Sequence, residues 1–174
     1  LAGAHGTNST TPLVRTLTQA GTTLTYAYNE TGNITSINDG SKTISYEYDL
    51  LGQLIRANDP YDPTGGTSGT TWVFEYDLGG NIQKKIAYAY TTGAVGSAVQ
   101  TNTFTYGASA WKDKLTAVNG EPIVYDNLGN PISYLGSSLS WEKGRQLKKF
   151  TKADGTVIQY TYNANGIRTS KTVD

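Results

Sequence analysis

Residues 46–52 read YEYDLLG, and this pattern decides the fold because close copies of it recur along the chain. Four further copies share an aromatic residue or Ile, any residue, Tyr, Asp or Asn, two variable residues and Gly: 26–32 (YAYNETG), 74–80 (FEYDLGG), 123–129 (IVYDNLG) and 160–166 (YTYNANG). Degenerate copies begin at Phe104 and Leu139. The second aromatic positions are 28, 48, 76, 106, 125, 141 and 162, so the repeat unit is about twenty residues long with two insertions.

Each part of the unit has a physical role. Side chains alternate between the two faces of a strand, so both rings of the aromatic-x-aromatic triplet lie on one face. The Asp or Asn then opens a turn by accepting a backbone hydrogen bond, and the Gly takes the left-handed conformation that closes a hairpin. Six residues after the second ring comes an apolar residue that we expect to pack beside it: Ile34, Leu54, Ile82 or Leu147. Pro131 breaks this pattern and is expected at a strand start, at an edge or in a bulge.

A second set of turns lies between the units, at residues 38–40 (NDG), 119–120 (NG), 135–136 (LG) and 153–155 (ADG). Asn-Gly and Asp-Gly are strong hairpin signals. The sequence therefore predicts an all-β protein, an antiparallel meander of about seven hairpins that form a curved or spiral sheet. The single helix candidate is Ala108–Leu115, and the first strand is expected at residues 13–17.

Two parts of the chain are distinguished by their patterning. Residues 1–21 form a loosely patterned N-terminal segment, and residues 22–174 form the repeat sheet. Insertions at about 60–70 and 91–102 are rich in Gly, Ser, Thr and Pro, which is typical of surface loops.

The composition excludes several kinds of chemistry. The chain has 174 residues, no Cys and a single histidine, His5, so thiolate and His-based sites are not expected. Its 14 basic and 14 acidic residues balance, which argues against a nucleic-acid partner. No apolar run approaches the ~20 residues of a membrane helix. With 37% hydrophobic residues and 13 Tyr, the core should be thin and built largely from aromatic rings.

The Tyr-Asp-x-x-Gly units in register resemble the YD repeats of rearrangement-hot-spot (RHS) proteins, bacterial wall-associated proteins, the C components of Tc toxins, and teneurins. The resemblance covers about residues 22–172 and includes residues 141–147 (WEKGRQL) and 166–171 (GIRTSK). It implies a β-sheet that spirals into a hollow shell around a toxin or other cargo segment, in a secreted or cell-surface bacterial protein. The self-cleaving core that follows such repeats has no match here, so no cleavage activity is carried over.

These observations together predict a non-enzymatic structural module with no cofactor and no metal. Its expected partners are flanking repeats or further copies joined through sheet edges, with toxin cargo or a glycan as further candidates. Neither nucleic-acid binding nor membrane insertion is expected. The residues that define the repeat are Tyr26, Tyr28, Gly32, Tyr46, Tyr48, Asp49, Gly52, Tyr76, Asp77, Gly80, Tyr125, Asp126, Gly129, Trp141, Gly144, Tyr160, Tyr162 and Gly166.

Alternative interpretations concern the same side chains. The Tyr rows and Trp72, Trp111 and Trp141 would serve as an adhesive or carbohydrate-binding platform if they were exposed. The turn aspartates would serve as Ca²⁺ ligands only if several oxygens converged, which one Asp per hairpin does not favour. The one local oxygen-rich cluster is Asp59, Asp62, Thr64 and Gly65. Glu47 and Glu75, at equivalent positions in neighbouring units, would suit glycoside hydrolysis only in a cleft.

Overall fold

The computed structural model describes residues 12–61, 68–108 and 110–174. Within these ranges every regular element is a β-strand and every strand pairing is antiparallel, which confirms the all-β prediction. No helix among these residues is both long and apolar enough for a membrane span.

The chain divides into two compact units, Leu1–Asn102 and Thr103–Asp174, with the boundary inside β8 (Ala98–Ala108). The strands before β8 are β1 (Thr16–Gln19), β2 (Thr22–Tyr28), β3 (Ile34–Asn38), β4 (Thr43–Tyr48), β5 (Leu54–Asp59), β6 (Thr70–Tyr76) and β7 (Ile82–Ala89). The strands after it are β9 (Trp111–Val118), β10 (Glu121–Pro122), β11 (Val124–Tyr125), β12 (Pro131–Tyr134), β13 (Ser137–Glu142), β14 (Gln146–Thr151), β15 (Val157–Tyr162) and β16 (Arg168–Val173).

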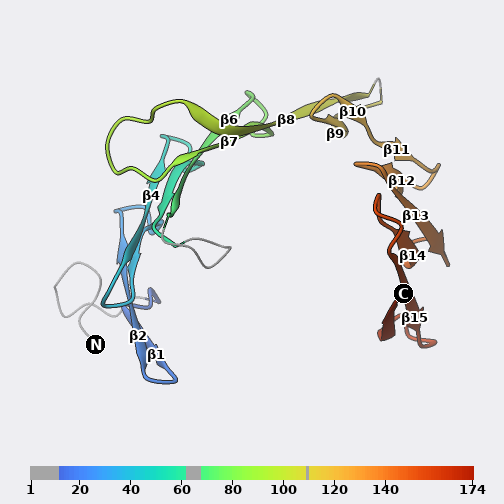
Figure 1. The fold of residues 1–174 in the computed structure, drawn as a ribbon, viewed down its shortest axis with the longest axis horizontal. Helices are drawn as coiled ribbons and strands as arrows, with labels where there is room; N and C mark the ends of the chain where they lie inside the picture. The colour runs from blue at the N-terminus through green and yellow to red at the C-terminus, as the bar shows by residue number, and fades with distance from the viewer. Residues whose placement is uncertain (1–11, 62–67, 109) are drawn as a thin grey trace. The chain divides into compact units, whose positions relative to one another are not determined.

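Strands lie side by side in sequence order, as a ten-stranded sheet from β1 to β10 and a six-stranded sheet from β11 to β16 (Figure 1). The seven repeat units form seven hairpins, as predicted: β2–β3, β4–β5, β6–β7, β8–β9, β11–β12, β13–β14 and β15–β16. The ladder is interrupted at Ile123, after Pro122. Proline has no amide hydrogen to donate to a ladder, and Pro131 is the first residue of β12, one of the places predicted for it.

Two-residue turns connect several strands at the end of the sheet opposite the Tyr-Asp turns. In the turn between β12 and β13, Leu135 has φ of 46° and Gly136 has φ of 69°. Two successive positive φ values are the geometry of a type I′ turn, whose twist matches that of the flanking strands. Leu135 therefore adopts a conformation that costs a non-glycine residue energy.

The helix predicted over Ala108–Leu115 is wrong, because the described residues of that stretch hold the end of β8 and the start of β9. These two strands pair Tyr106 with Leu115 and Phe104 with Val118. Cross-strand packing of a ring against an aliphatic side chain stabilises a hairpin. That tertiary gain overrides the weak local helical pattern.

The first strand is Thr16–Gln19, a few residues later than predicted. Its place is set by the turn at Ala20, which pairs Gln19 with Thr22. The predicted loop at 91–102 is shorter, because β8 begins at Ala98. Of the loop at 60–70, residues 62–67 lie outside the described residues, and so do residues 1–11 with His5.

Burial is slight among the described residues, most of which are half-buried or exposed. Among the described residues the buried apolar side chains are Ala57, Ile86, Ala87, Val118 and Ile158. The core is thus thin, as predicted, but its members are aliphatic. The rings of the repeats are half-buried, because a large ring that stands on a single sheet keeps one flank open.

Candidate functional site

The rings of the repeats stand together on one face of each sheet, which we call the ring face. Its members are half-buried: Tyr26, Tyr28, Tyr46, Tyr48, Phe74, Tyr76, Tyr125, Trp141, Tyr160 and Tyr162. The residue between each pair of rings is exposed on the other face. This alternation is the one that strand geometry dictates.

In six of the seven hairpins the second ring lies opposite the residue six positions further on, and the exception is Tyr106. The structure pairs Tyr28 with Ile34, Tyr48 with Leu54, Tyr76 with Ile82 and Trp141 with Leu147. At each of these pairs the register shifts, so the returning strand holds one extra residue in a β-bulge. A bulge increases the local twist and re-aims the side chain beside it.

The re-aimed second ring reaches the neighbouring hairpin. Its O–H or N–H donates a hydrogen bond to a backbone carbonyl earlier in the chain, and we call this contact the ring brace. The braces run from Tyr28 to Val14 (2.6 Å), Tyr48 to Ile34 (2.8 Å), Tyr76 to Leu54 (2.8 Å), Tyr125 to Leu115 (2.7 Å), Trp141 to Pro131 (2.7 Å) and Tyr162 to Leu147 (3.0 Å). Except for Val14, each acceptor is the residue opposite the second ring of the preceding hairpin.

The braces are partly screened from water. Burial raises the pKa of the Tyr48, Tyr76 and Tyr125 phenols above their ordinary value. A raised pKa keeps the phenol protonated, so that it remains a hydrogen-bond donor.

We expect Tyr76→Phe to lower the free energy of unfolding by about 1 kcal/mol, the net value of a typical hydrogen bond. The ring stays, so packing against Ile82 is kept, while the carbonyl of Leu54 loses its donor. Urea unfolding measures the change. Tyr26→Phe is the matched control, because the described residues show no brace from this first ring. Equal losses in both variants would contradict the brace.

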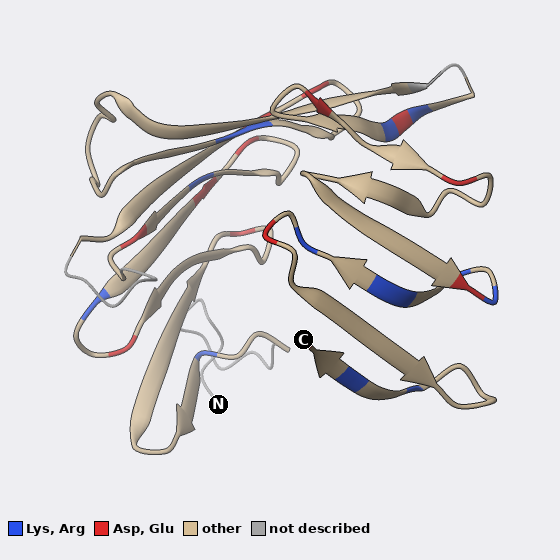
Figure 2. Cartoon of the chain, turned by 45° about the vertical axis from the view of Figure 1, so that its right-hand side comes forward, with Lys and Arg blue, Asp and Glu red and all other residues tan. Residues whose placement is uncertain are grey.

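In the five full copies of the repeat, the turn after the second ring is closed by its Asp or Asn. Figure 2 shows acidic residues, in red, at several hairpin turns. In the β4–β5 turn, Oδ1 of Asp49 accepts the amides of Leu51 (2.9 Å) and Gln53 (2.8 Å). The amide of Gly52 donates to the Asp49 carbonyl at 3.1 Å. The same two side-chain bonds recur from Asn29, Asp77, Asp126 and Asn163. These oxygens are therefore used inside their own turns.

Hydrogen bonds lower the pKa of several turn aspartates. The side chains of Asn81 and Asn130 are the main cause for Asp77 and Asp126, and the amide of Thr156 is the main cause for Asp154. The pKa of Asp39 is lowered to about 2. The main cause is the hydrogen bond from the amide of Lys42, and the next is the hydroxyl of Tyr61, which donates to the carboxylate. The same bond raises the pKa of Tyr61 to about 12.

We expect stability to fall as the pH drops from about 4, the unfolded Asp pKa, towards 2. A lowered folded pKa means that stability is present above the unfolded pKa and is lost as the carboxylate takes up its proton. Melting temperatures measured across this range check it. The double variant Asp77→Asn with Asp126→Asn should show a shallower pH dependence, because each amide oxygen still accepts from the turn but no longer titrates. An unchanged slope would contradict the assignment.

A second link between hairpins was not predicted from the sequence. Residues directly after the turn Gly are amides in four hairpins: Asn33, Gln53, Asn81 and Asn130. Asn130 is buried, and its Nδ2 donates to the carbonyl of Gly144 in the next hairpin at 2.6 Å. Asn33 and Gln53 approach Gly52 and Gly80 of the following turns, where a Cβ would lie 3.4 Å and 3.1 Å from their amide nitrogens. The recurring amide was the signal that could have revealed it.

The second insertion lies over the face opposite the rings. Nη2 of Arg56 donates to the carbonyls of Thr91 (2.9 Å) and Gly93 (2.7 Å). Thr71, which is fully buried, donates to the same Thr91 carbonyl at 2.9 Å and accepts the Thr91 amide at 2.9 Å. Nε of Arg56 donates to Asn58, which is also buried. We call residues 90–97 the strap, since this polar cluster fastens them to the sheet.

The acidic candidates are engaged elsewhere. Glu75 pairs with Lys84 at 2.7 Å and Glu47 lies 3.8 Å from Arg56, each across a strand pair. Asp59 accepts the amide of Tyr61, while Asp62, Thr64 and Gly65 lie outside the described residues. The part of the chain that the structure describes holds no group of three His, Cys, Asp or Glu residues placed for a metal ion.

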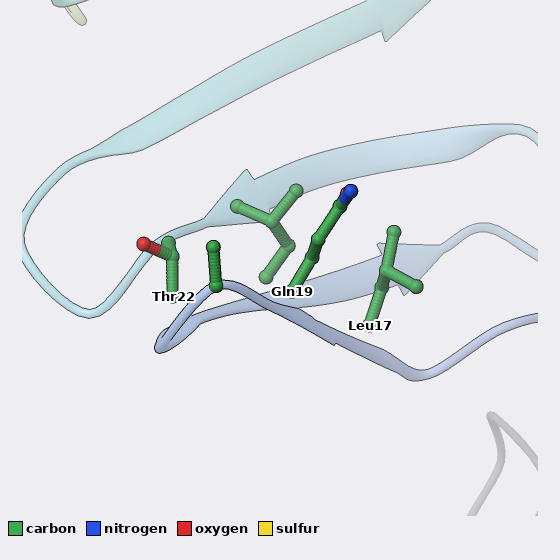
Figure 3. A pocket seen from close by; sticks show the side chains of 5 residues that line it. Leu17, Gln19 and Thr22 are labelled. Atoms are coloured by element: carbon green, nitrogen blue, oxygen red, sulfur yellow. The ribbon is translucent and has the colours of Figure 1, made fainter.

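A hollow with a mainly apolar lining lies in each of the two units, among the described residues. One, of about 290 Å³, lies at the first hairpin and is lined by Leu17, Gln19, Ala20, Thr22 and Leu24 (Figure 3). The other, of about 330 Å³, lies in the second unit and is lined by Leu115, Ile123, Tyr125, Pro131, Tyr134 and Leu139.

Comparison with known proteins shows the fold. No protein-family model matches the chain. No curated protein matches it either. Two similar solved structures are a Tc holotoxin pore from Photorhabdus luminescens, with a TM-score of 0.66, and a crystal structure of TcdB2-TccC3-TEV, with a TM-score of 0.65. Each is 22% identical over 86% of this chain, and the match spans 9% of the length of that chain. The sheet therefore has the fold of a segment of Tc toxin chains.

Proposed function

We propose that the chain is a non-catalytic wall segment of a hollow β-shell, built from YD repeats of the RHS family. It would belong to a secreted or cell-surface bacterial protein and would enclose or present a toxin or other cargo polypeptide. The fold shared with Tc toxin chains over 86% of this chain supports the shell. The repeating Tyr-Asp-x-x-Gly units support the family.

The ring braces are the observation that carries this proposal. Each brace ties a hairpin to its predecessor across the sheet, on the face that carries the rings. A sugar-binding platform needs open ring faces and polar groups that are free to bind the sugar. The rings here are half-buried and their donor groups are bonded to backbone, so they suit a rigid wall better than a ligand site. Glu47 and Glu75 are paired with Arg56 and Lys84 across strands. This pairing suits a structural wall better than it suits acid–base catalysis.

The shell is tested by electron microscopy of the protein expressed from its own gene with all flanking sequence. We expect a hollow particle, and we expect limited proteolysis to leave an enclosed polypeptide intact until the wall is cut. A solid particle, or cargo cut as fast as the wall, would contradict the proposal. Specific binding on a glycan array that is lost on substituting the ring-face tyrosines would favour the adhesive alternative.

The edges of the sheets lead to a prediction for the 174-residue chain by itself. Among the described residues β1 is hydrogen-bonded on one side only, and its four residues are exposed and uncharged. Leu17 and Gln19 project from it in Figure 3. An uncharged open edge is a template for pairing with another strand.

We expect light scattering to show a mass that rises with concentration, and Leu17→Lys to shift the chain towards monomer, because a charge at an edge opposes strand addition. Thr25→Lys, on the exposed side of the interior strand β2, is the matched control and should still associate. A wild-type chain that is monomeric at every concentration would contradict edge pairing.

A further inference from the structure

The hollow in the second unit forms where the ladder of strands is interrupted. Pro122 ends β10, Ile123 lies between the sheets, and Pro131 begins β12. Two prolines without amide hydrogens leave the short strands β10 and β11 with little backbone pairing. The hollow of about 330 Å³ lies beside this interruption and takes walls from β9, β11, β12 and β13.

The walls of the hollow present mainly carbon. Leu115, Ile123, Pro131 and Leu139 contribute aliphatic surface, and the hydroxyl of Tyr125 is turned to the carbonyl of Leu115 at 2.7 Å. Apolar walls bind apolar ligand groups by removing both surfaces from water. The volume is at the low end of the ~300–1,000 Å³ of ligand sites, which suits one aromatic side chain and not a drug-sized molecule.

A lysine side chain, Lys114, lies beside this apolar surface. The Nζ of Lys114 lies 4.0 Å from the ring centroid of Tyr125, a lining residue. Asp126, the carboxylate that follows Tyr125, uses both oxygens within its own turn, on Leu128 and Asn130. The ammonium of Lys114 is therefore positioned to attract an anionic group of a ligand whose ring enters the hollow.

We propose that this hollow holds an aromatic side chain of an extended polypeptide that carries a carboxylate beside the ring. The proposal rests on the proposed function, under which a polypeptide lies against the wall. The aromatic group enters among Leu115, Tyr134 and Leu139, and the carboxylate pairs with Lys114. The site deepens the role of the wall from plain enclosure to an anchor point for acidic-aromatic sequence.

The test uses the full 174-residue chain, labelled with ¹⁵N, and three blocked tetrapeptides followed by NMR titration. The first has the sequence Gly-Glu-Trp-Gly; the second replaces Glu with Gln, and the third replaces Trp with Ser. We expect amide shifts confined to the lining residues, affinity about fivefold weaker for the Gln peptide, and no binding of the Ser peptide. Equal binding of all three, or shifts spread over other strands, would overturn the proposal.

Variants of the chain complete the test. Lys114→Gln should weaken the Glu peptide to the level of the Gln peptide and leave the Gln peptide unaffected, as a double-mutant cycle requires of a direct pair. Lys112→Gln, at an exposed residue of the same strand, is the matched control and should change neither. Equal weakening by both lysine variants would overturn the pairing. If the peptides do not bind but electron microscopy shows a hollow particle, only this inference is overturned. If the peptides bind but the particle is solid, only the proposed shell is overturned.

Discussion

Gly80→Val is expected to destabilise the chain by about 2–4 kcal/mol, the largest loss that we predict for a single substitution. Gly80 has φ of 86°, a left-handed conformation that a β-branched residue adopts only with strain. A Cβ at this position would also lie 3.1 Å from Nε2 of Gln53, which reaches it from the preceding hairpin. The variant therefore strains its own turn and pushes away its neighbour. Urea unfolding followed by circular dichroism measures the loss.

Two other glycines separate these causes. Gly40 has φ of 91° and no heavy atom within 4 Å of a Cβ, so Gly40→Val should cost only the backbone strain, about 1–2 kcal/mol. Gly96 lies in the strap with neither a positive φ nor a neighbour within 4 Å, and Gly96→Val should stay within about 0.5 kcal/mol. Equal losses at Gly80 and Gly40 would show that the contact with Gln53 contributes nothing.

Arg56→Met is expected to release the strap. Methionine keeps the apolar stem of the side chain but removes the bonds to the carbonyls of Thr91 and Gly93. Hydrogen bonds from charged groups contribute about 1.5–3 kcal/mol each, so we expect amide hydrogen exchange at residues 91–97 to rise about 10- to 100-fold. The hairpins that lack strap contacts should exchange as before.

Arg168→Met serves as the control for Arg56→Met. Its guanidinium lies 5.4 Å from the ring centroid of Tyr160 at the far edge strand β16, so the substitution removes an exposed cation without touching the strap. Exchange at residues 91–97 should match the wild type. Unchanged exchange in the Arg56 variant would mean that Thr71 holds the strap without help from Arg56.

Local features of the fold were predictable because each depends on residues close in sequence. The ring triplet, the capping Asp and the turn Gly lie within seven residues, and the apolar partner of each ring follows six positions later. Strand alternation and turn chemistry suffice to place these groups. The stretch after Ala108 was mispredicted because its strand is specified by cross-strand partners and not by its own pattern.

Contacts between hairpins were not predictable in the same way. A Tyr hydroxyl can form hydrogen bonds with many different groups. Which carbonyl it bonds in each brace depends on the bulge and on the order of hairpins in the sheet. The attachment of the strap could not be predicted either. The composition of residues 90–97 indicates a loop, but it does not indicate that Arg56, 35 residues before Thr91, would bond to it. The Asn and Gln residues after the turn glycines can be seen in the sequence. That their side chains point towards the next turn depends on the geometry of the sheet.

The direction of the ring braces has a consequence for how the chain folds. Every donor lies after its acceptor, by 14, 14, 22, 10, 10 and 15 residues from the first brace to the last. A chain that leaves the ribosome N-terminus first thus presents each docking carbonyl before the ring that needs it. Such short closures carry a low entropic cost. We therefore expect hairpins to be added one at a time onto a finished edge, as in a growing one-dimensional array, so that a stalled nascent chain already holds its emerged hairpins in native register.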